Sequence, residues 1–274
     1  MNEIEQYEFD RQGYIVIPGF LGDAEVAQLS IAADRLLEHA VQQVALPPRK
    51  QSAWGPEYHA SPDLGYHVKG DTAEGSTVII EDFWNADPAF DLLVDHGPTM
   101  KYIRAIVAPR PTINNSEIRV RYRGNASRHH GGRRPETQKY RYNFTDGRID
   151  CMMVRLIYFV HDVSADEGAF TVIPGSHKSE LPSPYGTDPD TEPGTIALEV
   201  KSGDAILFTE ALRHGGRTNR SDQVRKTIHV GYGPYWMLSQ NAATMDEPQY
   251  ILESTLERWT PAQRDLFRAP GPHA

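Results

Sequence analysis

The second half of the chain is a succession of short segments with strand patterns, and this succession constrains the fold more than any other feature. Residues 118–122 alternate apolar and polar side chains with a period of two, as in a strand with one buried face. Residues 152–160 are almost continuously apolar, which predicts a strand covered on both faces. Clusters of Gly, Pro, Asp and Asn separate four further short segments: residues 169–173, 195–200, 205–208 and 226–232. Many short strands in succession predict a β-sandwich or a jelly roll.

The first half of the chain carries helical patterns instead. Residues 23–46 place apolar side chains at helical spacing, with acidic residues near the start, which predicts a helix. Residues 90–107 predict a second helix, interrupted by a Gly-Pro pair, whereas residues 47–75 are rich in Pro, Gly and His and predict an irregular loop. We therefore expect one mainly β domain over residues 1–274, with helices packed outside it.

Cysteine content and the N-terminal sequence limit the class of protein. The chain holds one cysteine, Cys151, which excludes a disulfide-stapled scaffold and thiolate-rich zinc or iron–sulfur sites. The N-terminal residues are acidic and lack the apolar segment of a signal peptide, and no run of about 18 apolar residues is present. We therefore expect a cytoplasmic protein with no membrane segment and no obligatory protein partner.

Charge is distributed unevenly along the chain. The net charge of −9 argues against binding to a nucleic-acid polymer. Residues 119–155 nevertheless hold ten basic and three acidic residues, whereas the rest of the chain is strongly acidic. A basic region in an acidic chain predicts a local site for a small anionic ligand. The candidate contacts are five arginines: Arg119, Arg121 and Arg123, which share one face of a regular strand, and Arg133 and Arg134.

Histidine and carboxylate side chains are the remaining metal ligands for a chain with a single cysteine. His214 lies just past a predicted strand, and Arg225 follows eleven residues later at the start of the next strand. Upstream, residues 172–178 read Val-Ile-Pro-Gly-Ser-His-Lys. Near the start of the chain, residues 9–21 read Phe-Asp-Arg-Gln-Gly-Tyr-Ile-Val-Ile-Pro-Gly-Phe-Leu.

These segments, in this order, resemble the phytanoyl-CoA dioxygenase family over residues 7–235. Members of that family are iron(II)- and 2-oxoglutarate-dependent oxygenases with a double-stranded β-helix, which is a jelly roll. The resemblance implies that His214 is the distal iron ligand and that Arg225 binds the C5 carboxylate of 2-oxoglutarate. A planar guanidinium suits this role because it donates two parallel hydrogen bonds to a carboxylate.

The proximal ligand motif departs from the family pattern. The family places a His-x-Asp or His-x-Glu motif upstream of the Pro-Gly-Ser-His turn, and the sequence there reads His129-His130-Gly131-Gly132. We identify His130 as the proximal ligand, with His129 as the alternative, and Gly132 at the position of the missing carboxylate. This departure resembles the iron(II)/2-oxoglutarate-dependent halogenases, in which chloride fills the vacant ligand position.

The leading hypothesis is an iron(II)/2-oxoglutarate-dependent halogenase that uses O2 and chloride to chlorinate an aliphatic carbon of a small anionic substrate. The surplus of arginine favours a nucleotide, such as a nucleoside monophosphate. One alternative is a hydroxylase whose non-standard third ligand comes from Asp146, Asp150 or a water molecule. Another is a non-catalytic jelly-roll relative that binds an anionic ligand. We interpret His177 and His229 as packing residues.

Overall fold

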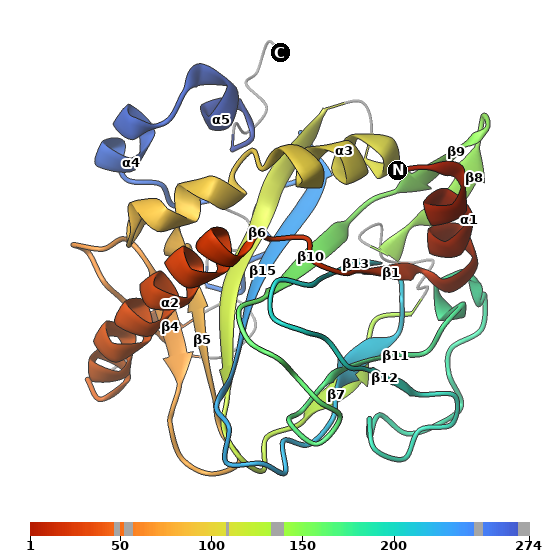
Figure 1. Ribbon diagram of the computed structural model, residues 1–274, viewed down its shortest axis with the longest axis horizontal. Helices are drawn as coiled ribbons and strands as arrows, with labels where there is room; N and C mark the ends of the chain where they lie inside the picture. Colours follow the sequence, from red (N-terminus) through yellow and green to blue (C-terminus); the bar gives the residue numbers. More distant parts are fainter. Residues whose placement is uncertain (47–49, 52–56, 108–109, 133–139, 244–248, 268–274) are drawn as a thin grey trace.

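The computed structural model describes residues 1–46, 50–51, 57–107, 110–132, 140–243 and 249–267, and the strands of this part form two antiparallel sheets and a hairpin (Figure 1). Among these residues the large sheet has nine strands, in the spatial order β1 (Tyr14–Ile17), β13 (Ala205–Thr209), β10 (Val154–Phe159), β15 (Arg225–Pro234), β6 (Pro111–Arg121), β5 (Thr77–Glu81), β4 (His67–Gly70), β3 (Glu57–Ala60) and β2 (Lys50–Gln51). The small sheet has the order β12 (Ile196–Leu198), β11 (Phe170–Val172), β14 (His214–Gly216) and β7 (Ser127–His130). The hairpin is formed by β8 (Tyr142–Thr145) and β9 (Arg148–Cys151).

Strands that neighbour one another in these sheets come from distant parts of the sequence. The N-terminal strand β1 pairs with β13, and β7 pairs with β14, so the chain crosses repeatedly between the sheets. This connectivity and the facing of the two sheets confirm the mainly β jelly-roll fold predicted from the sequence.

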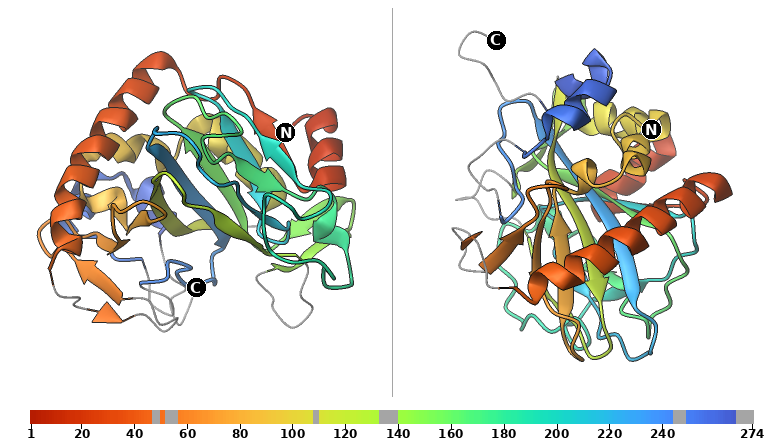
Figure 2. Two further views of the ribbon diagram at one scale, coloured as in Figure 1. Left: turned by 90° about the horizontal axis from the view of Figure 1, so that it is seen from below. Right: turned by 90° about the vertical axis from the view of Figure 1, so that its left-hand side faces the viewer.

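The helices lie outside the sheets. The α-helices are α1 (Glu3–Gln12), α2 (Asp23–Val44), α3 (Gly97–Ile106), α4 (Glu253–Arg258) and α5 (Pro261–Asp265), and the 3-10 helices are η1 (Phe83–Asn85), η2 (Pro88–Leu93) and η4 (Ser176–Lys178). The helix α2 crosses the outer face of the large sheet over β4 and β5 (Figure 2, right). Its start is capped by the Glu25 carboxylate, which accepts a hydrogen bond from the N–H of Gly22 (2.8 Å). No helix of the described part is long and apolar enough to cross a membrane.

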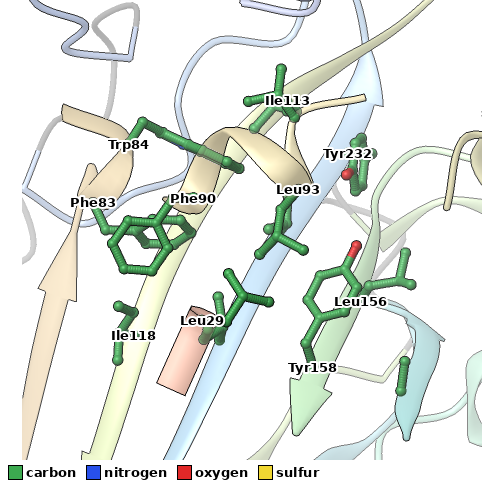
Figure 3. Packing of buried hydrophobic residues seen from close by; sticks show 14 of the residues in the cluster. Leu29, Phe83, Trp84, Phe90, Leu93, Ile113, Ile118, Leu156, Tyr158 and Tyr232 are labelled. Atoms are coloured by element: carbon green, nitrogen blue, oxygen red, sulfur yellow. The ribbon is translucent and has the colours of Figure 1, made fainter. Parts of the chain in front are cut away.

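The main hydrophobic core fills the space between these helices and the outer face of the large sheet. Figure 3 shows Leu29 of α2 near Ile118 of β6, with Phe83 and Phe90 packed beside them. Each of these four side chains is fully buried. Full burial of such a side chain stabilises the folded state by roughly 1.5–3 kcal/mol. The outer face of the sheet therefore has a structural role.

The inner face of the large sheet carries a different set of side chains. Along β6, Ile118 and Val120 point into the main core, and the alternate residues Glu117, Arg119 and Arg121 point inward because successive side chains of a strand face opposite sides. The next strand pairs in register with β6 and places Arg225 opposite Arg121, Thr227 opposite Arg119 and His229 opposite Glu117. One end of the inner face is therefore lined by charged and polar groups.

Two sequence predictions for the first half of the chain are wrong in detail. Residues 47–75 were expected to be an irregular loop, but β3 and β4 extend the large sheet there. Tyr58 and Val68 are fully buried on these strands, so tertiary packing outweighs the Gly- and Pro-rich composition. The predicted break at Gly97-Pro98 is confirmed, but the segment before it contains the 3-10 helix η2, and the α-helix begins at Gly97 because Pro98 in its first turn starts a new helix.

Candidate active site

The histidines His130 and His214 meet between β7 and β14 of the small sheet. They are directly paired in the strand register, and their ring centroids are 4.3 Å apart with the rings tilted by 58°. Phe208 from the large sheet and Phe170 from β11 pack against the His214 ring, with centroid distances of 4.7 and 5.6 Å. These contacts hold two imidazoles from different parts of the chain side by side at the wall of a cavity.

Backbone hydrogen bonds fix the tautomer of both rings. The Nδ1–H of His130 donates to the carbonyl oxygen of Arg128 (2.9 Å), and the Nδ1–H of His214 donates to that of Leu212 (2.7 Å). Because a carbonyl oxygen only accepts, the lone pair of each neutral ring is on Nε2. Burial, and next the proximity of His130, hold the pKa of His214 well below its ordinary value, so this ring is neutral near pH 7. Hydrogen bonds of this kind orient histidines that bind metal ions.

His129 has a different environment from its neighbour. Its Nδ1 is 2.7 Å from Glu192 Oε2 and its Nε2 is 2.9 Å from Thr171 Oγ1, so both ring nitrogens are engaged. The side chain is buried on the opposite side of β7 from His130, as alternation along a strand requires. The geometry therefore leaves His130, and not His129, with a nitrogen available for a ligand.

A turn of two glycines follows His130. Gly131 has φ +76° and Gly132 has φ +86°, a region of backbone conformation that glycine adopts without steric penalty. A Cβ added to Gly131 would collide with the carbonyl oxygen of Leu212, so this position has no room for a side chain. A Cβ added to Gly132 would meet no atom of the described residues within 4 Å. The described residues therefore leave space at the position where the family pattern has a carboxylate.

The cavity beside the two histidines is lined from both sheets. Its lining consists of arginine, histidine and aromatic side chains with two small residues: Arg119, Arg121, Arg155, Arg225, His130, His214, His229, Phe170, Phe208, Ser127 and Gly215. Arg225 is almost fully buried, and its Nη1 donates to the carbonyl oxygen of Gly168 (2.6 Å). Burial lowers the pKa of Arg225 to about 10, which still leaves it charged at neutral pH.

Two buried carboxylates neutralise part of this charge. Glu117 accepts hydrogen bonds from Arg119 Nε (2.5 Å) and from Arg155 Nη1 (2.5 Å). Burial alone would raise the pKa of Glu117, but the two guanidinium groups hold it well below its ordinary value. Arg155 also forms an ion pair with Glu210. Arg119 and Arg155 therefore have partners inside the protein.

Several predicted site residues lie elsewhere. Arg123 was expected to share a face with Arg119 and Arg121, but it lies beyond the end of β6, where the strand alternation stops. It is exposed there and forms ion pairs with Asp222 and Glu74. The candidates Arg133 and Arg134 lie outside the described residues.

The carboxylates considered as replacement metal ligands lie on the hairpin. Asp150 is on β9 and pairs with Arg141 (3.0 Å), and Asp146 is in the turn between β8 and β9. Neither lines the cavity. Within the described ranges, no group of three His, Cys, Asp or Glu side chains could hold a metal ion.

The structure also places residues at the cavity that the sequence analysis assigned to packing or did not single out. His229 lines the cavity, with its Nε2 2.9 Å from Thr227 Oγ1. The sequence carried a signal for this position, because polar side chains occupy every second position at the start of β15: Arg225, Thr227 and His229. Glu117 and the arginines of β6 follow the same period of two. His177, by contrast, is buried outside this cavity, where its Nε2–H donates to the carbonyl oxygen of Asp10 (3.0 Å).

The donor set fits a metal ion with a carboxylate ligand beside it. Two imidazole Nε2 lone pairs are suited to iron, and the side chains of Arg121 and Arg225 contribute buried nitrogens, Nη1 and Nε, that have no hydrogen-bond partner in the described structure. Unpartnered buried donors are rare in folded proteins. They indicate that an anion completes this site.

Comparison with known proteins identifies relatives of this chain. A family model described as phytanoyl-CoA dioxygenase (PhyH) matches residues 9–227. The dioxygenase aneA of Aspergillus aculeatus is 34% identical over 104 residues, which cover 37% of this chain and 32% of the relative. The dioxygenase FUM3 of Gibberella moniliformis is 27% identical over 240 residues, covering 84% of this chain and 71% of the relative. The chain thus matches about a third of the length of aneA and of the next relatives in similarity.

A solved structure has a similar fold. HygX from Streptomyces hygroscopicus, crystallised with nickel and 2-oxoglutarate, superimposes with a TM-score of 0.69 at 21% sequence identity. The superposition covers 87% of this chain and 89% of HygX.

Proposed function

The chain belongs to the phytanoyl-CoA dioxygenase family, and we propose that it is an iron(II)/2-oxoglutarate-dependent halogenase acting on a small anionic substrate. In this proposal His130 and His214 bind iron, Arg225 binds the C5 carboxylate of 2-oxoglutarate, and Gly132 leaves the chloride position open. The observation that carries it is the pair of imidazoles with available Nε2 atoms beside a glycine turn, with no third protein ligand in the described part of the chain.

The residues of the chain have defined tasks in this proposal. Iron, when bound with 2-oxoglutarate, O2 and chloride, supplies hydrogen abstraction and the transfer of chlorine to carbon. The carbonyl groups of Arg128 and Leu212 orient the two imidazoles through their Nδ1–H groups. Phe170 and Phe208 cover the His214 ring and exclude water from one side of it. The positive charge of Arg225 orients the dicarboxylate so that its other end reaches the metal position.

The substrate class follows from the charge of the cavity. Four arginines line it, and among the described residues only Glu117 and Glu210 form ion pairs with them. Arg119 is partly exposed and accessible to a substrate, and Arg133 and Arg134 remain candidates in the same basic region. An anionic substrate is therefore favoured, and a nucleoside monophosphate is the first compound class to screen.

Chloride binding to the metal tests the proposal without knowledge of the substrate. Purified protein is loaded with iron(II) and 2-oxoglutarate in the absence of oxygen, and chloride is titrated while the visible metal-to-ligand charge-transfer band is recorded. The proposal predicts a band that shifts with saturable dependence on chloride. In Gly132→Asp the added carboxylate occupies the halide position, so the band is expected to form and to be insensitive to chloride.

Gly132→Ala is the matched control for that variant. Gly132 has a positive φ, so any side chain there strains the backbone by about 1–3 kcal/mol. Alanine introduces the same strain without a ligand, and its band is expected to remain chloride-dependent. A chloride-independent band in the wild-type protein contradicts halogenation, and a protein that binds no iron contradicts enzymatic function and favours the non-catalytic relative.

Hydroxylation is the second candidate, and Glu210 favours it. The negative charge of this carboxylate acts on both His130 and His214, raising the pKa of each ring against the effect of desolvation. If metal binding drew Glu210 away from its ion pair with Arg155, it would supply the missing third ligand. Glu210→Gln then loses iron affinity, whereas Asp150→Asn on the distant hairpin does not. The halogenase proposal predicts that both variants retain iron, and the mass of the product distinguishes added chlorine from added oxygen.

A further inference from the structure

Two guanidinium groups face one another across the inner face of the large sheet, and neither has an ion-pair partner among the described residues. Arg121 on β6 and Arg225 on β15 are directly paired in the antiparallel register, and both are buried, with 6% and 2% of their surface exposed. Nη1 of Arg121 and Nε of Arg225 have no hydrogen-bond partner within the described structure. Arg119 and Arg155, which line the same cavity, differ from these two arginines because each forms an ion pair with Glu117.

This arrangement is unfavourable in the absence of a ligand. Each positive charge opposes the other, and after burial, the proximity of Arg225 is the largest cause that holds the pKa of Arg121 well below its ordinary value. A buried charge without a partner opposes folding. The pair is therefore expected to be completed by an anion that reaches both groups.

Packing directs Arg121 toward this position. Gly216 on β14 lies against its guanidinium, and a Cβ added to Gly216 would collide with Arg121 Nη1. The backbone carbonyl of Arg121 accepts a hydrogen bond from Asn219 Nδ2 (3.4 Å), on the segment that leads from β14 to β15. A glycine at 216 thus leaves the space that the guanidinium occupies.

We propose that Arg121 is a second anchor for the distal carboxylate of 2-oxoglutarate, which binds between the guanidinium groups of Arg121 and Arg225. This inference rests on the proposed dependence on 2-oxoglutarate. A carboxylate has two oxygens that each accept hydrogen bonds, so one group satisfies donors from two sides. The direct register of the two strands places both arginines beside the same point, which favours one shared carboxylate over two separate anions.

Binding of two oxoacids to nickel-loaded protein tests the inference. 2-Oxoglutarate has the distal carboxylate, and 2-oxobutyrate shares its oxoacid end without that group. Calorimetric titration of Arg121→Gln is expected to show roughly 10- to 100-fold weaker binding of 2-oxoglutarate, as for the loss of a hydrogen bond to a charged group. Binding of 2-oxobutyrate is expected to be unchanged.

Two further variants complete the test. Gly216→Ala leaves Arg121 in the chain but displaces its guanidinium, so it is expected to reproduce the selective loss of 2-oxoglutarate affinity. Arg123→Gln, two residues beyond Arg121 and exposed to solvent, is expected to bind both oxoacids like the wild-type protein. If Arg121→Gln does not fold, Gly216→Ala decides the question.

The outcomes separate this inference from the proposed function. A wild-type protein that binds neither oxoacid contradicts the proposed function itself. Wild-type binding with unchanged 2-oxoglutarate affinity in Arg121→Gln and Gly216→Ala overturns the role of Arg121 while the proposed function stands. Equal weakening of 2-oxoglutarate and 2-oxobutyrate also overturns it, because the variants would then act on the metal site.

Discussion

The inner face of the large sheet has an apolar half and a charged half. The two halves differ in whether their side chains find partners within the described structure. In the apolar half, Ile157, Phe159 and Phe208 pack with Phe170 and Val172 of the small sheet into a closed second core. In the charged half, β6 and β15, together with Arg155 of β10, place arginine and histidine side chains at a cavity. The side chains of the apolar half pack against one another, whereas the charged half holds buried donors that have no hydrogen-bond partner among the described residues.

This difference shows how one scaffold combines stability with a binding site. Apolar burial is favourable without any ligand, so the apolar half stabilises the contact between the two sheets. Uncompensated buried charge opposes folding, so the charged half is maintained at the expense of stability. Sites of this kind are where function is expected, because a ligand can supply what the chain does not.

The largest expected effect tests the apolar half. Phe159→Ala removes a fully buried ring from the second core, and such a change destabilises a protein by about 3–5 kcal/mol. Urea unfolding followed by circular dichroism measures this loss. A loss below about 1 kcal/mol would be typical of a surface site and would show that the apolar half does not hold the sheets together.

His177 lies outside the cavity, so it tests how a buried titratable group with no proposed role in the site changes the stability of the fold with pH. Burial lowers the pKa of His177 to about 4, below its ordinary value of 6.5. The unfolded chain therefore takes up a proton first as the pH falls, so stability is complete above pH 6.5 and is lost as the pH decreases toward about 4. A shift of this size corresponds to about 3 kcal/mol. Unfolding measured at pH 7 and pH 4.5 is expected to show this loss in the wild-type protein.

His177→Gln is the matched variant for that measurement. Its amide can still donate to the carbonyl oxygen of Asp10 but does not titrate. The difference in stability between pH 7 and pH 4.5 is expected to be smaller in the variant. Equal acid sensitivity in the two proteins would assign the pH dependence to other groups.

The smallest expected effect concerns the charged half and has the opposite sign. Arg121→Gln removes an uncompensated buried charge, so the variant without ligand is expected to be more stable than the wild type by about 1 kcal/mol. Saturating 2-oxoglutarate is expected to stabilise the wild type more than the variant. Thermal unfolding with and without 2-oxoglutarate measures both effects. A variant less stable than the wild type in both conditions would show that Arg121 stabilises the fold.

The sequence predicted much of this contrast, but the two adjacent histidines show what it could not predict. The alternation of residues 118–122 predicted that Arg119 and Arg121 share a face, because side-chain direction in a strand is a local property. The sequence favoured His130 over His129 through the family resemblance alone, because both histidines follow the same local rules. Only the position of Glu192 and Thr171, which come from distant segments, decides that His129 is fully engaged.

The sequence alone therefore determined the jelly-roll fold, the family and the identity of the groups available for chemistry, since these depend on strand periodicity and on motifs within short segments. The tertiary structure decided which charges meet. Arg121 and Arg225, separated by more than a hundred residues, become neighbours through strand pairing, and Arg123 is excluded because the strand ends before it. Local alternation fixes the face of a side chain, but only long-range register and packing determine what lies opposite, and charge compensation depends on that neighbour.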